Sequence, residues 1–133
     1  MNYWLVKSEP GTYSWEDLEK DKKTVWDGVR NFQARANLKA MKKGDIAFFY
    51  HSNVGKEIVG IAKISKAHFP DPSDKDWIAV ELVPFKKIKS PVSLADIKAN
   101  KKLGKMALVR SSRLSVQPVS EKEYEMVIEM SQK

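Results

Sequence analysis

The runs IAFFY (residues 46–50), IVGIAKIS (residues 58–65) and WIAVELV (residues 77–83) decide the fold of this chain. Each is short and rich in β-branched and aromatic residues, which are favoured in strands. Turn-forming stretches at residues 52–55 and 70–73 separate the three runs. Strands that follow one another through such turns predict an antiparallel meander, which forms the scaffold for the rest of the chain.

The flanking segments add strands and helices to this scaffold. Residues 2–6 and 114–119 predict two further strands. Ser14, Asn31, Ser93 and Ser120 are residue types that cap helix N-termini, and three of them are followed three residues later by Asp or Glu. They predict helices over residues 14–20, 31–41 and 93–100, and a last one from Ser120. We therefore expect an α+β fold with a curved, barrel-like antiparallel sheet and flanking helices.

Length and composition limit the classes of protein to which the chain can belong. A chain of 133 residues with 42% hydrophobic content can bury a core as one domain spanning residues 1–133. The absence of cysteine excludes a disulfide framework, a thiol nucleophile and cysteine-based metal sites. With only two histidines and no calcium-loop pattern, we expect neither a metal nor a cofactor.

No apolar run approaches the length of a membrane span, and the N-terminus lacks the features of a signal peptide. The expected location is the cytoplasm, or the nucleus in a eukaryote. A membrane partner is not expected. The sequence does not define the oligomeric state, and a monomer is favoured.

The positive charge is concentrated in one part of the chain. The net charge is +7, yet residues 86–113 contain nine basic residues against one acid, so this stretch carries +8 and the remainder −1. Such a stretch is either a solvated lysine face or a surface that contacts phosphates. The phosphate-contacting candidates are Lys86, Lys87, Lys89, Arg110 and Arg113, together with Arg35.

Two dense runs, VWDGVRN (residues 25–31) and FFYHSN (residues 48–53), combine aromatic rings with amide, hydroxyl and guanidinium groups. This mixture is typical of a pocket for a planar, polar ligand such as a nucleobase. Trp26 is the candidate stacking wall, although a buried core tryptophan is the alternative. Asn31 could read a base edge or cap the following helix, and His51 could contact the ligand or be hydrogen-bonded within the fold. Trp4 and Trp15 are expected in the core.

Several motifs, in order along nearly the whole chain, resemble the EVE domain. They are YWLVKSEP (residues 3–10), WDGVRN (26–31), QAR (33–35), MKKGD (41–45), YHSN (50–53), VG (59–60), PVSL (91–94) and RLSV (113–116). The chain looks like a stand-alone EVE protein of the kind related to thymocyte nuclear protein. The resemblance implies a PUA-like fold, related to the YTH domains that hold a methylated adenine in an aromatic cage.

The resemblance also implies a function, which is the recognition of a modified base in DNA or RNA. A base in a duplex must leave the stack before a pocket can hold it. The Lys7-Ser8 pair resembles the YTH lysine-serine pair at the pocket opening, and Ser52 and Arg30 are further ligand-binding candidates. Glu9 could form an ion pair with Arg30 or Arg35.

Three functions are weighed on this basis. The favoured one is a non-catalytic module that binds a methylated or oxidised-methyl base. The alternative is a small hydrolase acting on modified nucleosides, in which Lys7 and Glu9 would supply acid and base groups. A protein-interaction adaptor is a weaker third possibility.

Overall fold

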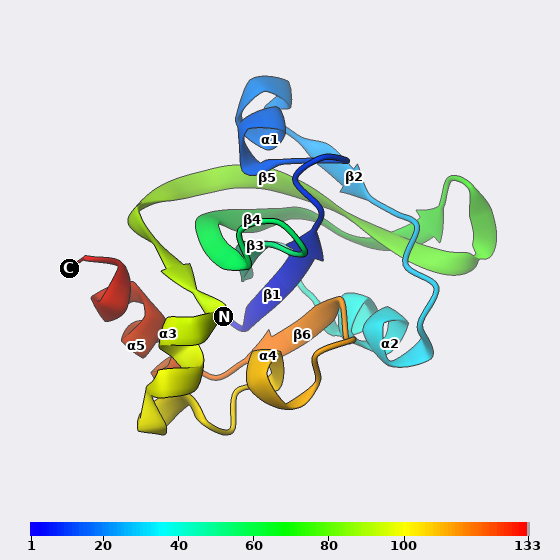
Figure 1. Cartoon of the computed structure of the whole chain (residues 1–133). Helices are drawn as coiled ribbons and strands as arrows, with labels where there is room; N and C mark the ends of the chain where they lie inside the picture. Colours follow the sequence, from blue (N-terminus) through cyan, green and yellow to red (C-terminus); the bar gives the residue numbers. More distant parts are fainter. Residues whose placement is uncertain (133) are drawn as a thin grey trace.

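A single curved sheet of six strands forms the centre of the protein in a computed structural model, which describes residues 1–132. Its strand order is β2-β5-β4-β3-β1-β6 (Figure 1). The strands are β1 (Tyr3–Ser8), β2 (Thr24–Trp26), β3 (Ile46–His51), β4 (Glu57–Asp71), β5 (Asp74–Ser93) and β6 (Val116–Val119). The predicted α+β fold is confirmed, and the three runs that define the meander become the central strands β3, β4 and β5.

The pairing is antiparallel except between β1 and β3, which run parallel. The expected antiparallel sheet is therefore mixed at this one pair. The cause is the connection between the two strands: it contains α1 (Trp15–Asp21), β2 and α2 (Phe32–Ala40), and this crossover returns the chain to the end of the sheet from which β1 began.

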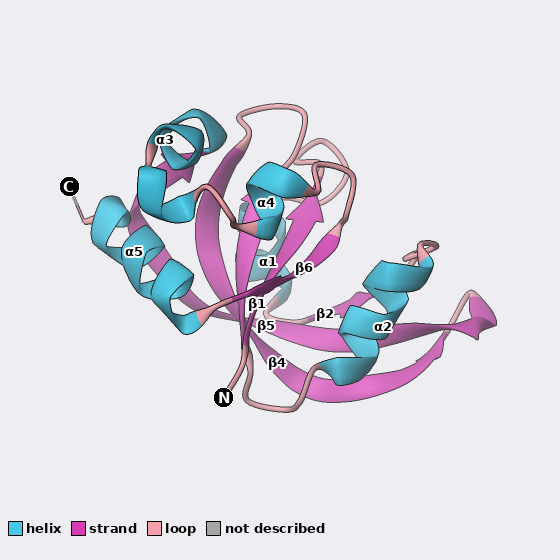
Figure 2. Cartoon of the chain, turned by 90° about the horizontal axis from the view of Figure 1, so that it is seen from below, coloured by secondary structure: helices cyan, strands magenta, loops and turns pink. Residues whose placement is uncertain are grey.

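Strands β4 and β5 are much longer than the sequence patterns indicated. They have 15 and 20 residues and form one long hairpin whose turn lies at residues 72–73. The register between them shifts at several points, including the intervals Ile64/Lys66 and Lys66/Phe69. Such irregularities increase the local twist and bend of a strand. The hairpin accordingly curves around the molecule instead of lying flat (Figure 2).

The helices begin where their capping residues predict. Ser14 and Asp17 form a reciprocal capping box at α1, and Ser120 and Glu123 form another at α5 (Glu121–Ser131). The side chain of Ser93 accepts a hydrogen bond at the start of α3 (Leu94–Ala99). A 3₁₀ turn, η1 (Lys101–Leu103), and the short α4 (Ala107–Arg110) complete the set. Among the described residues, no helix is long and apolar enough to cross a bilayer.

Both faces of the sheet are buried. Trp4, Trp15 and Phe49 belong to the apolar cluster beneath α1 and α2, whereas Phe48 and Val127 belong to the cluster beneath α3, α4 and α5. The expected core positions of Trp4 and Trp15 are confirmed. Helix α2 also contacts both β5 and β6, and its Asn37 amide donates to the Val116 carbonyl (2.8 Å), so this helix connects β6 with the β4–β5 hairpin.

Candidate functional site

A cavity of about 600 Å³ opens where β1 ends, and its size is that of a small-molecule pocket. Its walls come from the end of β1 and the loop after it, from β2, from the segment between β2 and α2, and from Ser115 before β6. Four of the predicted ligand-binding residues line this cavity, namely Lys7, Ser8, Trp26 and Arg30. Segments from three parts of the sequence therefore meet around one hollow.

Trp26 has one side in the core and the other on the cavity. It ends β2, is half-buried, and meets the ring of Phe49 edge-on at 5.6 Å and 77°. It also lines the cavity. The indole is therefore anchored by the core and also borders the hollow. Stacking of a ligand on it stays a prediction.

Lys7 and Ser8 fix the mouth of the cavity through hydrogen bonds. The Lys7 amine donates to the Ser112 carbonyl (2.7 Å) and lies 6.0 Å from the centre of the Tyr50 ring. Burial lowers the pKa of this amine. The Ser8 hydroxyl donates to the Tyr13 carbonyl, which leaves its oxygen able to accept a hydrogen bond.

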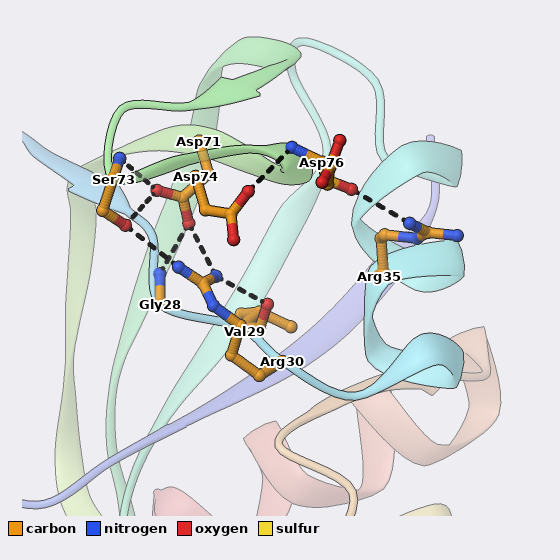
Figure 3. Close-up of polar contacts among 8 residues, drawn as sticks. All are labelled: Gly28, Val29, Arg30, Arg35, Asp71, Ser73, Asp74 and Asp76. Atoms are coloured by element: carbon orange, nitrogen blue, oxygen red, sulfur yellow. Dashed lines mark hydrogen bonds and ion pairs between the residues drawn. The ribbon is translucent and has the colours of Figure 1, made fainter.

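Arg30 is held by a buried carboxylate at the turn of the β4–β5 hairpin (Figure 3). Its Nη1 lies 3.0 Å from Asp71 Oδ2, and its Nη2 donates to the Ser73 hydroxyl (3.0 Å). Asp71 is completely buried, whereas the Arg30 side chain remains 39% exposed. The guanidinium is thus oriented by its partners but still accessible to a ligand.

Asp71 also anchors the backbone that forms one wall of the cavity. Its carboxylate accepts from the Gly28 N–H (2.9 Å) and from the Ser73 N–H (2.7 Å). Gly28 has a φ of +76°, a conformation that favours glycine. Burial raises the pKa of Asp71, but the hydrogen bonds from Ser73, Gly28 and Arg30 outweigh burial and hold the pKa well below its usual value.

Asp71 was not identified from the sequence. The Asp-Pro-Ser sequence after a strand is a local signal for a turn in which the aspartate accepts from its own backbone. The contacts to Gly28 and Arg30 span more than 40 residues, so no local pattern predicts them.

The remaining predicted ligand-binding residues do not line this cavity. Asn31 caps α2 by accepting from the Ala34 N–H (2.9 Å), and it borders a separate shallow depression together with Arg113.

His51 Nε2 accepts from the Trp15 N–H (3.1 Å), and burial lowers the His51 pKa, which favours the neutral ring that this bond requires. The Ser52 N–H donates to the Ser8 carbonyl (2.9 Å). A contact between Asn31, His51 or Ser52 and a ligand stays a prediction.

The suggested ion pair of Glu9 with Arg30 or Arg35 does not form. The Glu9 carboxylate accepts from the Asn53 side-chain amide (2.7 Å), because the loops after β1 and β3 lie side by side at the ends of these parallel strands. Arg30 instead pairs with Asp71, and Arg35 donates to the Asp76 carbonyl (3.0 Å).

The basic stretch is distributed over several elements. Lys86, Lys87 and Lys89 are exposed on β5, Arg110 ends α4, and Arg113 is exposed before β6. Of these, Arg113 borders the depression that Asn31 also lines. Phosphate contact by these residues stays a prediction. Among residues 1–132, no group of three or more His, Asp or Glu side chains could hold a metal ion.

Comparison with known proteins identifies the family. The sequence model of the EVE domain matches residues 2–130. The chain belongs to the EVE domain family. This EVE protein is 37% identical to human thymocyte nuclear protein 1 over 99% of its own length and 75% of the relative. It is 30% identical to an uncharacterised protein of Schizosaccharomyces pombe over 97% of its own length and 68% of the relative.

Solved structures also match this EVE protein over nearly its whole length. A protein of Agrobacterium tumefaciens is 49% identical with a TM-score of 0.95, and 98% of this EVE protein and 93% of that chain are covered. Human thymocyte nuclear protein 1, in complex with DNA containing 5-methylcytosine, is 34% identical with a TM-score of 0.93, covering 100% and 99% of the two chains. An ASCH protein of Zymomonas mobilis is 10% identical with a TM-score of 0.59 over 97% and 95%, a likeness of fold alone that agrees with the expected PUA-like fold.

Proposed function

We propose that this EVE protein binds DNA that carries a modified base and holds that base, flipped out of the stack, in the cavity beside Trp26. The observation that carries the proposal is the cavity itself, in which an anchored indole borders the same hollow as the Ser8 hydroxyl and the Arg30 guanidinium. The similarity to human thymocyte nuclear protein 1, which has been solved in complex with 5-methylcytosine DNA, makes 5-methylcytosine the first base to test. Methylated and oxidised-methyl bases share the flat ring that this cavity would hold.

The chemistry of the cavity suits such a ligand. Extruding a base costs a few kcal/mol, and stacking on an aromatic side chain returns roughly 1–3 kcal/mol per base. The core contact with Phe49 holds the indole in place before a ligand arrives, which reduces the entropy lost on binding. Lys7 donates to a carbonyl oxygen and not to a carboxylate, so its positive charge stays available to a neighbouring phosphate.

A role in binding is favoured over catalysis by the positions of the two groups that a hydrolase would use. The Lys7 amine is engaged with Ser112, and the Glu9 carboxylate with Asn53. Both residues line the cavity, but their partners lie on different loops and the two groups are not paired with each other as an acid and a base. We therefore expect mass spectrometry to recover a modified nucleoside unchanged after incubation with the protein.

Binding of matched DNA duplexes tests the proposal. We expect the protein to bind a short duplex with one central 5-methylcytosine roughly tenfold more tightly than the same duplex with cytosine, because a shaped apolar wall discriminates a methyl group by about this factor. Both affinities should fall as salt rises, since phosphate contacts release counterions. Fluorescence anisotropy titrations at two salt concentrations measure both effects.

A panel of duplexes with other methylated and oxidised-methyl bases completes the experiment. Equal affinity for every modified and unmodified duplex would contradict the proposal.

A further inference from the structure

An exposed group of aromatic rings and guanidinium planes lies next to the cavity. We call it the aromatic–arginine stack, and it consists of Phe32, Trp77, Arg30 and Arg35. Phe32 is the first residue of α2 and is 70% exposed. Its ring stacks on that of Trp77 in β5, with 5.2 Å between the ring centres and 29° between the planes.

The two arginines hold this stack in place. The Arg35 guanidinium lies 5.0 Å from the centre of the Phe32 ring and 5.3 Å from that of Trp77. Its Nη1 donates to the Asp76 carbonyl (3.0 Å), which fixes the plane of the guanidinium (Figure 3). The Arg30 guanidinium lies 5.6 Å from the Trp77 ring. A single exposed phenylalanine is common, but here Trp77 and Arg35 hold the Phe32 ring in place, and the three groups form one ordered surface.

The stack is continuous with the proposed base site. Arg30 belongs to both, because it lines the cavity and also lies beside the Trp77 ring. Only Asn31 separates Arg30 from Phe32 in the sequence. Arg30 therefore links the stack to the wall of the cavity.

The charge near the stack indicates which part of a nucleotide it would contact. Asp74 and Asp76 are exposed on the hairpin beside Arg35, and their negative charge offsets that of the two guanidiniums, so charge alone does not select a phosphate group. Aromatic faces and guanidinium planes instead attract the uncharged face of a base. The stack thus fits a nucleobase better than the sugar-phosphate backbone.

We propose that the aromatic–arginine stack is a second binding surface, on which the base next to the flipped base stacks against Phe32. This proposal rests on the proposed function, because the flipped base places its neighbour at the stack. Every base has a flat face, so stacking here should strengthen binding without regard to sequence or modification. The cavity would discriminate modified from unmodified bases, and the stack would increase the affinity for either duplex.

The variant Phe32→Ala tests the proposal against a matched control, Phe85→Ala. Phe85 is also an exposed phenylalanine beside a cation, with Lys63 at 5.1 Å, but it lines no part of the cavity. Anisotropy titrations would use the same 5-methylcytosine and cytosine duplexes. We expect Phe32→Ala to weaken binding of both duplexes by about 5- to 20-fold, with the ratio between them unchanged. Phe32→Trp should retain binding, and Phe85→Ala should bind as the wild type does.

The outcomes separate this proposal from the proposed function. Unchanged affinity in Phe32→Ala would overturn the stacking surface, even if the wild type still prefers the modified duplex. Loss of that preference with unchanged binding of the cytosine duplex would also overturn it, because Phe32 would then belong to the base site. If the wild type shows no preference but Phe32→Ala weakens both complexes, the surface is supported and the proposed function fails. Thermal unfolding of each variant verifies that the fold is intact.

Discussion

Replacing Trp26 by alanine should weaken binding of a 5-methylcytosine duplex by up to about 100-fold, which corresponds to roughly 3 kcal/mol of lost stacking. The flipped base would lose the aromatic wall that offsets the cost of leaving the DNA stack. Binding of the cytosine duplex should change less, so the preference for the modified base should nearly disappear. Anisotropy titrations with the two duplexes measure both effects.

The conservative variant Trp26→Phe separates stacking from folding. Trp26 packs against Phe49, so its truncation also removes a contact in the core. Phenylalanine retains an aromatic face and should keep most of the affinity, whereas alanine should not. If Trp26→Ala is folded, as judged by circular dichroism, and still prefers the 5-methylcytosine duplex as strongly as the wild type, the indole is not the stacking wall.

Replacing Asp71 by alanine should lower the free energy of unfolding by roughly 3 kcal/mol. The change removes the buried carboxylate that accepts hydrogen bonds from Gly28, Arg30 and Ser73. The segment that carries Arg30 to the cavity would then lose its anchor on the hairpin. Urea unfolding of the wild type and the variant measures the difference, and affinity for the duplex should fall as well.

The pH dependence of unfolding identifies the role of the Asp71 charge. The pKa of this carboxyl is lower in the folded protein than its unfolded value near 4, so the ionised form stabilises the fold. This stabilisation is complete above the unfolded pKa and is lost as the pH falls below about 4 toward the folded value. Asp71→Asn should be less stable than the wild type at pH 7, and the difference should shrink as the medium becomes acidic. A difference that stays constant between pH 7 and pH 3 would contradict this role.

The parts of the fold that the sequence predicts are those determined by local chemistry. Ser14, Ser93 and Ser120 cap helices through contacts within three residues, and such contacts are visible in the sequence. The lengths of β4 and β5 depend instead on pairing between distant residues. Polar and exposed positions such as Lys66 and His68 weaken the strand pattern, yet the partner strand continues beside them.

In the candidate site, too, local patterns are visible in the sequence, whereas contacts between distant residues are not. The sequence singles out Trp26 and His51 by one criterion, an aromatic ring beside polar groups, but the fold gives them different surroundings. Trp26 ends an edge strand and faces the cavity, whereas His51 lies at the end of a central strand, where the N–H of Trp15 reaches its ring. The two residues differ because α1 packs on the sheet and brings the Trp15 N–H to the His51 ring. The contacts of Asp71 with Gly28 and Arg30 are likewise created by the hairpin, and no local pattern predicts them.

The most direct test of the central claim is a crystal structure of the protein in complex with a duplex that contains one 5-methylcytosine. We predict that the modified base lies outside the helix, with its ring against the Trp26 indole and its edge toward Ser8 and Arg30. A modified base that remains stacked in the duplex, or that lies elsewhere on the protein surface, would contradict the account.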